Sequence, residues 1–164
     1  ETTGLNTSYC EITERYFEEY NLGFSPSNGL LKINTPIPQD VVKLTNITNK
    51  MCERDGDYLS KFKKEIKELY NYCENPIFIA HNGTSFDHKI LNNKYIFTDD
   101  MNIKGQLKDS KYIIRMLNDY DTRNDKLEII YETILKKESP YKSHRAEADV
   151  KMMIDILKHL SYEL

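Results

Sequence analysis

The sequence has few cysteines and no long hydrophobic run. No apolar stretch in its 164 residues approaches the roughly 20 residues that span a bilayer, and no signal sequence with a basic start and an apolar centre is visible. Cys10, Cys52 and Cys73 are odd in number and form no CxxC pair, which argues against a disulfide framework and against a zinc site. We therefore expect an intracellular protein, in the cytoplasm or nucleoid, without a membrane partner.

The chain also lacks an excess of positive charge. Its formal net charge is -3, so any contact with nucleic acid has to come from a local cluster of Lys and Arg. The length fits one domain over residues 1–164, without internal repeats or low-complexity segments. Lys, Asn, Ile and Tyr are common, which is typical of an AT-rich genome and leaves a viral origin open.

Strands are expected in the first part of the chain. The bulky residues of 9–21 fit either a helix face or an edge strand, and we favour the strand. The turn-rich stretch 21–29 is interpreted as a loop, and the sequence LLKIN at 30–34 as a second strand. Two prolines, Pro36 and Pro38, then introduce a short helix.

Strands and helices alternate in the rest of the chain. Asp57 is a good N-cap for an amphipathic helix that runs to Cys73, with its lysines at 61–67 on a solvated face. The apolar run 77–80 predicts a buried, parallel strand that leads directly into a helix. Leu107 is expected to end a weak strand, and helices are expected from Asp109 or Ser110, over 125–136 and over 145–162. This order indicates an α/β domain with a mixed sheet.

Asp149 stands among apolar positions of the last predicted helix. Ala146, Met153 and Ile156 fall on the same stripe, and an unpaired buried charge is costly, so metal ligation is one explanation and a solvated helix position the other. His144 lies five residues earlier and would point away from Asp149 in a continuous helix. We therefore place His144 in the loop before the helix, with Ser143 as a candidate N-cap.

Asp87 has two interpretations. Thr84 followed by an acid three residues later resembles a capping box, which would make Asp87 structural. Asp87 also follows a buried strand, at the edge where open α/β sheets bind ligands. In that position it would converge with Asp149. His81 and Asn82, in the preceding turn, are either groups that support the site or turn residues that bind their own backbone.

Three motifs then resemble a known family. The sequences ETTGL at 1–5, AHNGTSFD at 80–87 and HRAEAD at 144–149 resemble, in order and separation, the three motifs of the DEDDh family of 3′→5′ exonucleases. The segment IPQDVVKLTNIT also resembles that family, with Asn46 where a glycine is usual. The resemblance spans nearly the whole chain and implies a ribonuclease H-like fold, a mixed β-sheet flanked by helices.

The first motif of the family is D-x-E-T-T-G, and its aspartate belongs two residues before Glu1, on the central strand of the sheet. Neither this aspartate nor this strand is part of the sequence, which begins at Glu1. We therefore expect that 1–164 is a single exonuclease domain without its N-terminal strand, taken from a longer protein. Taken literally, the sequence lacks one of the four metal-binding carboxylates, which puts the activity of this chain in question.

The resemblance implies a mechanism with two metal ions. Glu1, Asp87 and Asp149 would hold two Mg²⁺ (or Mn²⁺) ions, and His144 would be the general base on the attacking water. Four residues would bind the terminal nucleotide with help from two more: Thr2, Thr3, Gly4 and Leu5, assisted by Asn82 and Phe86. Positive charge along the phosphate path is available from Arg145, Lys142 and Lys89, all of which also fit ordinary surface positions.

The leading hypothesis is a metal-dependent 3′→5′ exonuclease that releases nucleoside 5′-monophosphates from the 3′ ends of single-stranded or frayed DNA. A DNA polymerase is the expected partner if the enzyme proofreads. Family members that digest RNA share the same motifs, so a 3′→5′ exoribonuclease stays an alternative. A third alternative is a catalytically inactive module that binds nucleic acid or a polymerase.

Overall fold

The computed structural model describes residues 1–20, 25–74, 76–101, 103, 105–118, 125–142 and 144–162. Within these residues the strands form two separate two-stranded sheets. β1 (Glu14–Phe17) and β2 (Ser27–Leu30) pair antiparallel, whereas β3 (Phe78–Ala80) and β4 (Leu107–Asp109) pair parallel. Both strand orientations are therefore present, and the predicted α/β fold class is confirmed.

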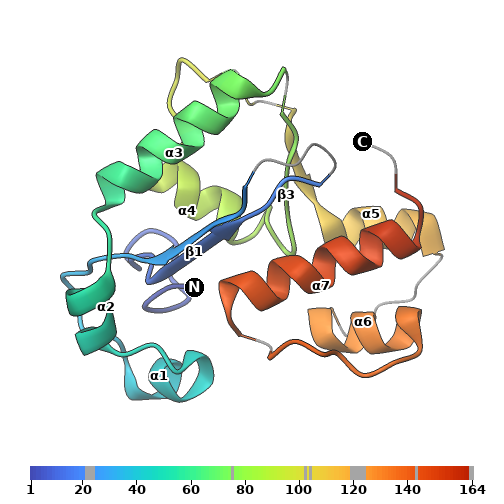
Figure 1. Cartoon of the computed structure of the whole chain (residues 1–164), viewed down its shortest axis with the longest axis horizontal. Coiled ribbons are helices and arrows are strands. Elements are labelled where there is room, and N and C mark those ends of the chain that lie inside the picture. Colours follow the sequence, from blue (N-terminus) through green and yellow to red (C-terminus); the bar gives the residue numbers. More distant parts are fainter. Residues whose placement is uncertain are drawn as a thin grey trace.

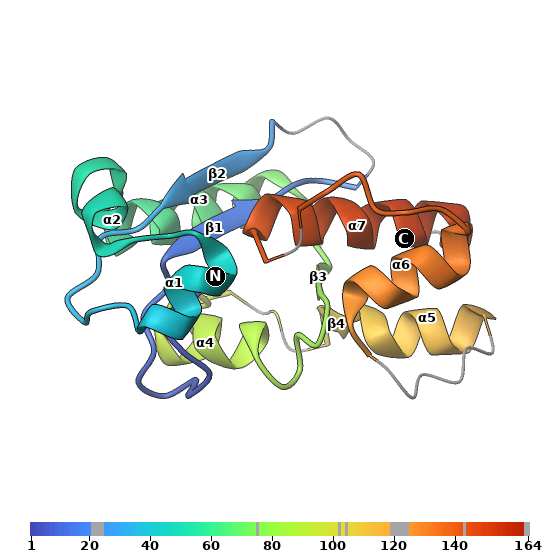
Figure 2. The same cartoon turned by 90° about the horizontal axis from the view of Figure 1, so that it is seen from below.

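The helices gather at the two ends of the molecule (Figures 1 and 2). Toward one end lie the helices of the first half of the chain: α1 (Gln39–Thr45), α2 (Asn49–Asp55), α3 (Leu59–Tyr72) and α4 (Asp87–Asn93). Toward the other end lie those of the second half: α5 (Ser110–Asn118), α6 (Leu127–Leu135) and α7 (Ala146–His159). The strands run between the two groups, and the N-terminus lies near the start of α7 in both views.

Separate apolar clusters hold these groups together. One cluster joins α5, α6 and α7, with Ile114, Tyr131 and Ile156 fully buried. Another packs Phe62 and Ile66 of α3 against the segment 96–103 and against Leu31. The apolar stripes predicted for these helices are therefore their buried faces. None of the helices in the described ranges is both long and apolar enough to cross a membrane.

Several predicted elements are confirmed. The strand in 9–21 forms as β1, over Glu14–Phe17, and the short helix after Pro38 forms as α1. The run 77–80 forms the parallel strand β3, and the helices expected after it form as α4, α5, α6 and α7. Asp109 caps α5, since its carboxylate accepts the backbone N–H of Lys111 at 3.1 Å.

Other details of the prediction are wrong. The second strand covers Ser27–Leu30 rather than 30–34, so part of the predicted loop 21–29 is strand, because its backbone pairs with β1 whatever its side chains are. Residues 21–24 of that loop lie outside the described residues. Asp57 is not the N-cap of α3, since its carboxylate pairs with Lys61 and Arg15 and the helix begins after Tyr58. β3 is half-buried rather than buried, because it pairs with β4 alone among the described strands.

Candidate active site

Glu1 is held beside β1 by backbone pairing. The N–H of Thr13 donates to the carbonyl of Glu1 at 2.9 Å, and the N–H of Thr3 donates to the carbonyl of Glu11 at 2.8 Å. The amino nitrogen of Glu1 donates to the carbonyl of Glu14 at 2.7 Å. The backbone of Glu1 is therefore fixed by main-chain bonds, and the residue is half-buried.

Asp87 is the first residue of α4 and is half-buried. The capping-box interpretation is wrong, because Phe86 occupies the N-cap position and no side chain caps the helix there. Burial raises the pKa of Asp87, the amino-terminal charge of Glu1 lowers it, and the carboxylate of Glu1 raises it by a smaller amount. Both charged groups of Glu1 therefore act on Asp87.

Asp109, at the end of β4, organises the turn that leads into α4. Its carboxylate is 5% exposed and accepts the backbone N–H groups of Asn82 at 3.0 Å and Thr84 at 3.1 Å, besides the cap of α5. Asn82 has φ of 59°, a left-handed conformation that Asn tolerates better than most residues. Asp109 was not predicted as a site residue, although its position after a strand is the same signal that singled out Asp87.

His81 and Asn82 are tied to α5 and the segment before α6. One ring nitrogen of His81 bonds the Ser110 hydroxyl at 2.9 Å and the other bonds the carbonyl of Asp125 at 2.8 Å. Burial lowers the pKa of His81. The Nζ of Lys111 lies 3.4 Å from Oδ1 of Asn82, and since an ammonium only donates, the Asn82 amide N–H₂ is left for another acceptor. His81 is therefore a structural residue, whereas no described residue accepts a hydrogen bond from the amide N–H₂ of Asn82.

Asp149 lies in the first turn of α7, on the apolar stripe predicted for it. The stripe includes Met153 and Ile156, both buried, and Asp149 itself is half-buried. Burial raises the pKa of Asp149 to about 6, with a further contribution from the negative charge of Glu1 and an opposing one from His144. Asp149 is therefore a carboxylate kept partly out of water next to other charged groups of the site.

His144 lies in the loop before α7, as predicted. It is exposed and has φ of 62°, again in the left-handed region. None of the described residues hydrogen-bonds to its imidazole, so the ring is open to solvent and substrate. The candidate cap Ser143 lies outside the described residues.

Glu1 is the common neighbour of the other two predicted carboxylates, since its charge acts on both Asp87 and Asp149. Among the described residues, no Lys or Arg side chain pairs with any of the three. Oxygen donors with a surplus of negative charge fit a hard cation such as Mg²⁺. In the part of the chain described, however, no three His, Cys, Asp or Glu side chains are arranged as a ready-made metal site.

The residues predicted to bind the terminal nucleotide fall into two groups. The hydroxyls of Thr2 and Thr3 are used within the fold, since Thr2 donates to the carbonyl of Gly4 at 2.7 Å and Thr3 accepts the N–H of Glu11 at 2.9 Å. Leu5 is 89% exposed, and a Cβ at Gly4 would meet nothing within 4 Å. Gly4 and Leu5 therefore present an open, partly apolar surface.

Arg145, predicted as a substrate contact, forms an ion pair within the fold. Its guanidinium binds the carboxylate of Glu14, a buried residue of β1 that the sequence did not indicate. Lys142 and Lys89 are exposed, and Phe86 is half-buried at the start of α4. Glu14 carries no local signal for this role, because it lies 131 residues from its partner.

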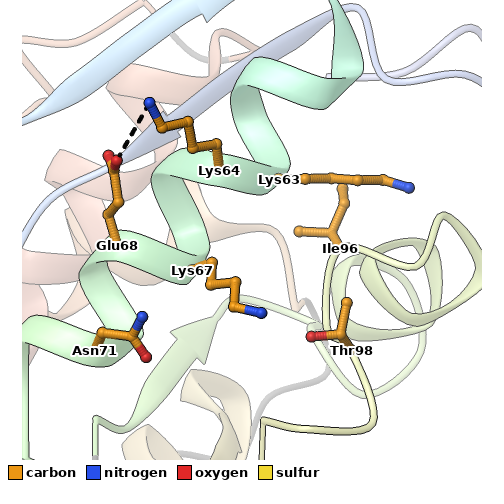
Figure 3. A pocket seen from close by; sticks show the side chains of 7 residues that line it. All are labelled: Lys63, Lys64, Lys67, Glu68, Asn71, Ile96 and Thr98. Atoms are coloured by element: carbon orange, nitrogen blue, oxygen red, sulfur yellow. Dashed lines mark ion pairs between the residues drawn. The ribbon is translucent and has the colours of Figure 1, made fainter.

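A hollow of about 350 Å³ lies elsewhere, between α3 and the segment after α4 (Figure 3). It is lined by Lys63, Lys64, Lys67, Glu68, Asn71, Ile96 and Thr98, and it includes none of the predicted site residues. Lys64 is 3.6 Å from Glu68, and Lys67 is 2.7 Å from Asp100. Most of the positive charge is thus balanced locally, in agreement with the predicted solvated face.

Two curated relatives match more than half of the chain. An uncharacterized exonuclease, R569, of Acanthamoeba polyphaga mimivirus is 30% identical over 161 residues, which are 94% of this chain and 47% of that protein. A PolC-type DNA polymerase III of Mycoplasma genitalium is 30% identical over 97 residues, which are 58% of this chain and 6% of the polymerase. The chain therefore spans less than half the length of these relatives.

Solved exonuclease structures and an exonuclease family model also match the chain. Escherichia coli Exonuclease I in complex with a dA16 oligonucleotide superposes with a TM-score of 0.79 at 16% identity, over 98% of this chain and 39% of that one. Its complex with a 5cy-dT13 oligonucleotide gives a TM-score of 0.77. The RNase_T exonuclease model matches residues 1–157. The chain therefore belongs to the RNase_T (DEDDh) family of exonucleases, which are metal-dependent phosphodiester hydrolases.

Proposed function

We propose that the protein is a metal-dependent exonuclease that removes nucleotides from the 3′ ends of single-stranded or frayed DNA and releases nucleoside 5′-monophosphates. One observation carries the proposal: burial raises the pKa values of both Asp87 and Asp149, the carboxylate of Glu1 adds to both shifts, and no Lys or Arg side chain among the described residues pairs with either aspartate. A cluster of this kind destabilises a metal-free fold, and it is useful when cations bind there.

In this proposal Glu1, Asp87 and Asp149 hold two Mg²⁺ (or Mn²⁺) ions. When bound, the ions would offset the negative charge of the phosphodiester and make the attack of water on its phosphorus easier. His144 accepts the proton of the attacking water at an imidazole nitrogen, because its ring is exposed and imidazole is the side chain that most often acts as a general base in enzymes. The open approach to the ring supports this role.

The terminal nucleotide is proposed to lie against the segment 2–5. Leu5 offers an exposed apolar side chain to a base, and Gly4 leaves room for close approach. The amide N–H₂ of Asn82 suits a phosphate oxygen, and Phe86 lies next to Asp87. These contacts address the sugar-phosphate backbone and a base face, so we expect little sequence preference.

The preference for DNA is supported by the Exonuclease I structures, which contain oligodeoxynucleotides. The likeness to PolC-type polymerases supports a proofreading role with a DNA polymerase as partner.

The test uses the full-length protein with DNA and RNA oligonucleotides labelled at the 5′ or 3′ end, in Mg²⁺, Mn²⁺ or chelator. We expect a ladder that recedes from the 3′ end, needs the metal, and is lost in Asp149→Asn and His144→Ala. Matched controls are Glu147→Gln, on the same turn of α7, and His159→Ala, an exposed histidine at the other end of that helix. Both controls should retain activity.

Each other outcome favours a different function. A ladder on RNA alone would indicate the exoribonuclease. Binding of oligonucleotides without cutting would indicate the inactive module. Internal or metal-independent cutting, or full activity of His144→Ala, would refute the mechanism.

A further inference from the structure

Glu14 is the anchor of the segment that carries His144. Its carboxylate, with a side chain 10% exposed, lies 3.0 and 3.1 Å from Nε of Arg145 and also binds Nη2 of that guanidinium. The same carboxylate accepts the backbone N–H of Ala146 at 2.9 Å. Glu14 therefore caps α7 and forms a forked ion pair with the residue just before the helix.

The backbone of Glu14 bonds Glu1, the first of the proposed metal ligands. Its carbonyl accepts the amino nitrogen of Glu1 at 2.7 Å, and its own N–H is 3.4 Å from the carbonyl of Glu1. One residue of β1 thus joins Glu1 to the first turn of α7, where Asp149 lies. The pKa of Glu14 is lowered: burial alone would raise it, but Arg145 and the N–H of Ala146 outweigh that effect.

The backbone N–H of His144 bonds the carboxylate of Asp149, but its side chain has little to hold it. Its φ of 62° costs about 1 to 2 kcal/mol for a residue with a Cβ, and its ring is exposed. Among the described residues no hydrogen bond fixes the imidazole. The backbone of His144 is therefore held by Asp149, and next to it in the chain Arg145 is fixed on Glu14.

We propose that Glu14 and Arg145 form a clamp that positions His144 beside the carboxylates, so that both are positioning residues for the reaction. The inference rests on the proposed function, since it takes His144 as the general base. It also gives Arg145 a role different from the predicted substrate contact. With Nε and Nη2 on Glu14, Arg145 acts through its neighbour rather than on the substrate.

An ion pair on the opposite face of β1 provides the matched control. Arg15, next to Glu14, binds Glu65 of α3 at 2.8 Å and Asp57 at 3.2 Å. Adjacent residues of a strand point to opposite faces, so this pair is turned away from α7. Glu65→Gln thus weakens a buried ion pair of the same strand without touching the clamp.

The experiment measures kcat, KM and amide hydrogen exchange of the full-length protein for Glu14→Gln, Arg145→Lys and Glu65→Gln. Arg145→Lys keeps the charge of a side chain that is 39% exposed, so folding should be retained. We expect kcat of both clamp variants to fall by about ten- to a hundredfold with KM nearly unchanged, while Glu65→Gln keeps the wild-type kcat. In the metal-free protein, exchange over residues 144–149 should be faster in the clamp variants alone.

A double-mutant cycle with His144→Ala decides how Arg145 acts. If Arg145 acts through His144, Arg145→Lys has no further effect on the residual activity of His144→Ala. If Arg145→Lys lowers activity by the same factor in the wild type and in His144→Ala, or if it raises KM at constant kcat, the clamp is overturned. Arg145 would then be a substrate contact. Unchanged exchange over 144–149 in Glu14→Gln would overturn the clamp as well. A wild-type protein without metal-dependent activity refutes the proposed function instead, and the exchange measurement still tests the clamp.

Discussion

Replacing Asp149 by Asn should make the metal-free protein more stable while it abolishes activity. Asn has nearly the same size as Asp, so the packing around this half-buried position is preserved. The charge is removed from a half-buried position where Glu1 already places another negative charge. The substitution therefore relieves both causes of the raised pKa at once.

The magnitude follows from the pKa of Asp149, which rises from 3.8 to about 6 on folding. This difference of about 2.2 corresponds to a destabilisation of the folded state of up to about 3 kcal/mol. Solvent screening at the half-buried site reduces this value. Because the pKa is raised in the folded protein, the folded state holds the proton longer than the unfolded one, and stability falls as pH rises from 3.8 to 6. Above about pH 6 the whole penalty is present, and below about pH 4 it vanishes.

The assay is urea unfolding in chelator at about pH 5 and about pH 7.5. At the higher pH, Asp149→Asn should exceed the wild type by up to about 3 kcal/mol, and at the lower pH by about half of that. Glu147→Gln is the control, because Glu147 forms an ion pair with Lys151 at 2.5 Å and its side chain is 47% exposed. Loss of this ion pair should change the free energy of unfolding by no more than about 0.5 kcal/mol at either pH.

Added Mg²⁺ should reverse the order. A cation that binds only the folded protein stabilises it by mass action, and the variant has lost one of the proposed ligands. If Asp149→Asn is less stable than the wild type in chelator, or if its advantage does not depend on pH, the reasoning about the acidic cluster is refuted.

Two further predictions concern the frame of the site. Asp109→Ala removes the acceptor of three backbone N–H groups, so the free energy of unfolding should fall by at least about 2 kcal/mol in urea unfolding, and a change below about 0.5 kcal/mol would show that water replaces the carboxylate. Gly56→Ala places a Cβ 2.2 Å from the carbonyl oxygen of Cys52, at the end of α2. The backbone has to shift, so we expect a loss of about 1 to 3 kcal/mol in thermal unfolding, whereas an unchanged midpoint would mean that α2 moves without cost.

Much of the fold was predictable because its helices bury continuous stripes. Ile130 and Ile134 of α6, like Phe62 and Ile66 of α3, recur at helical spacing and are buried as the period requires. β2 was misplaced because its residues, SNGL, have no strand pattern. Its position is set by hydrogen bonds to β1, and a local sequence does not record the partner that supplies them.

The candidate site divides in the same way. Asp87, Asp149 and the loop position of His144 follow from motifs and from short-range rules on strands and helix starts. Glu14 and Asp109 do not, since each carboxylate binds backbone groups that lie at least 25 residues away, apart from the cap at Lys111. Such pairs are visible only after folding, because many acids in the chain have the same local surroundings as these two.

The acids around the site differ in how their charge is compensated, and this difference separates structural roles from proposed ligands. Glu14 is buried with a guanidinium and a backbone N–H, and its pKa is lowered. Asp87 and Asp149 are half-buried without a Lys or Arg partner in the described part of the chain, and their pKa values are raised. A fold that pairs one buried acid with a guanidinium and leaves two half-buried acids without such a pair, both acted on by the carboxylate of Glu1, has concentrated negative charge in one place. Cations bound there would supply the missing charge, so their binding and the stability of the fold should be linked.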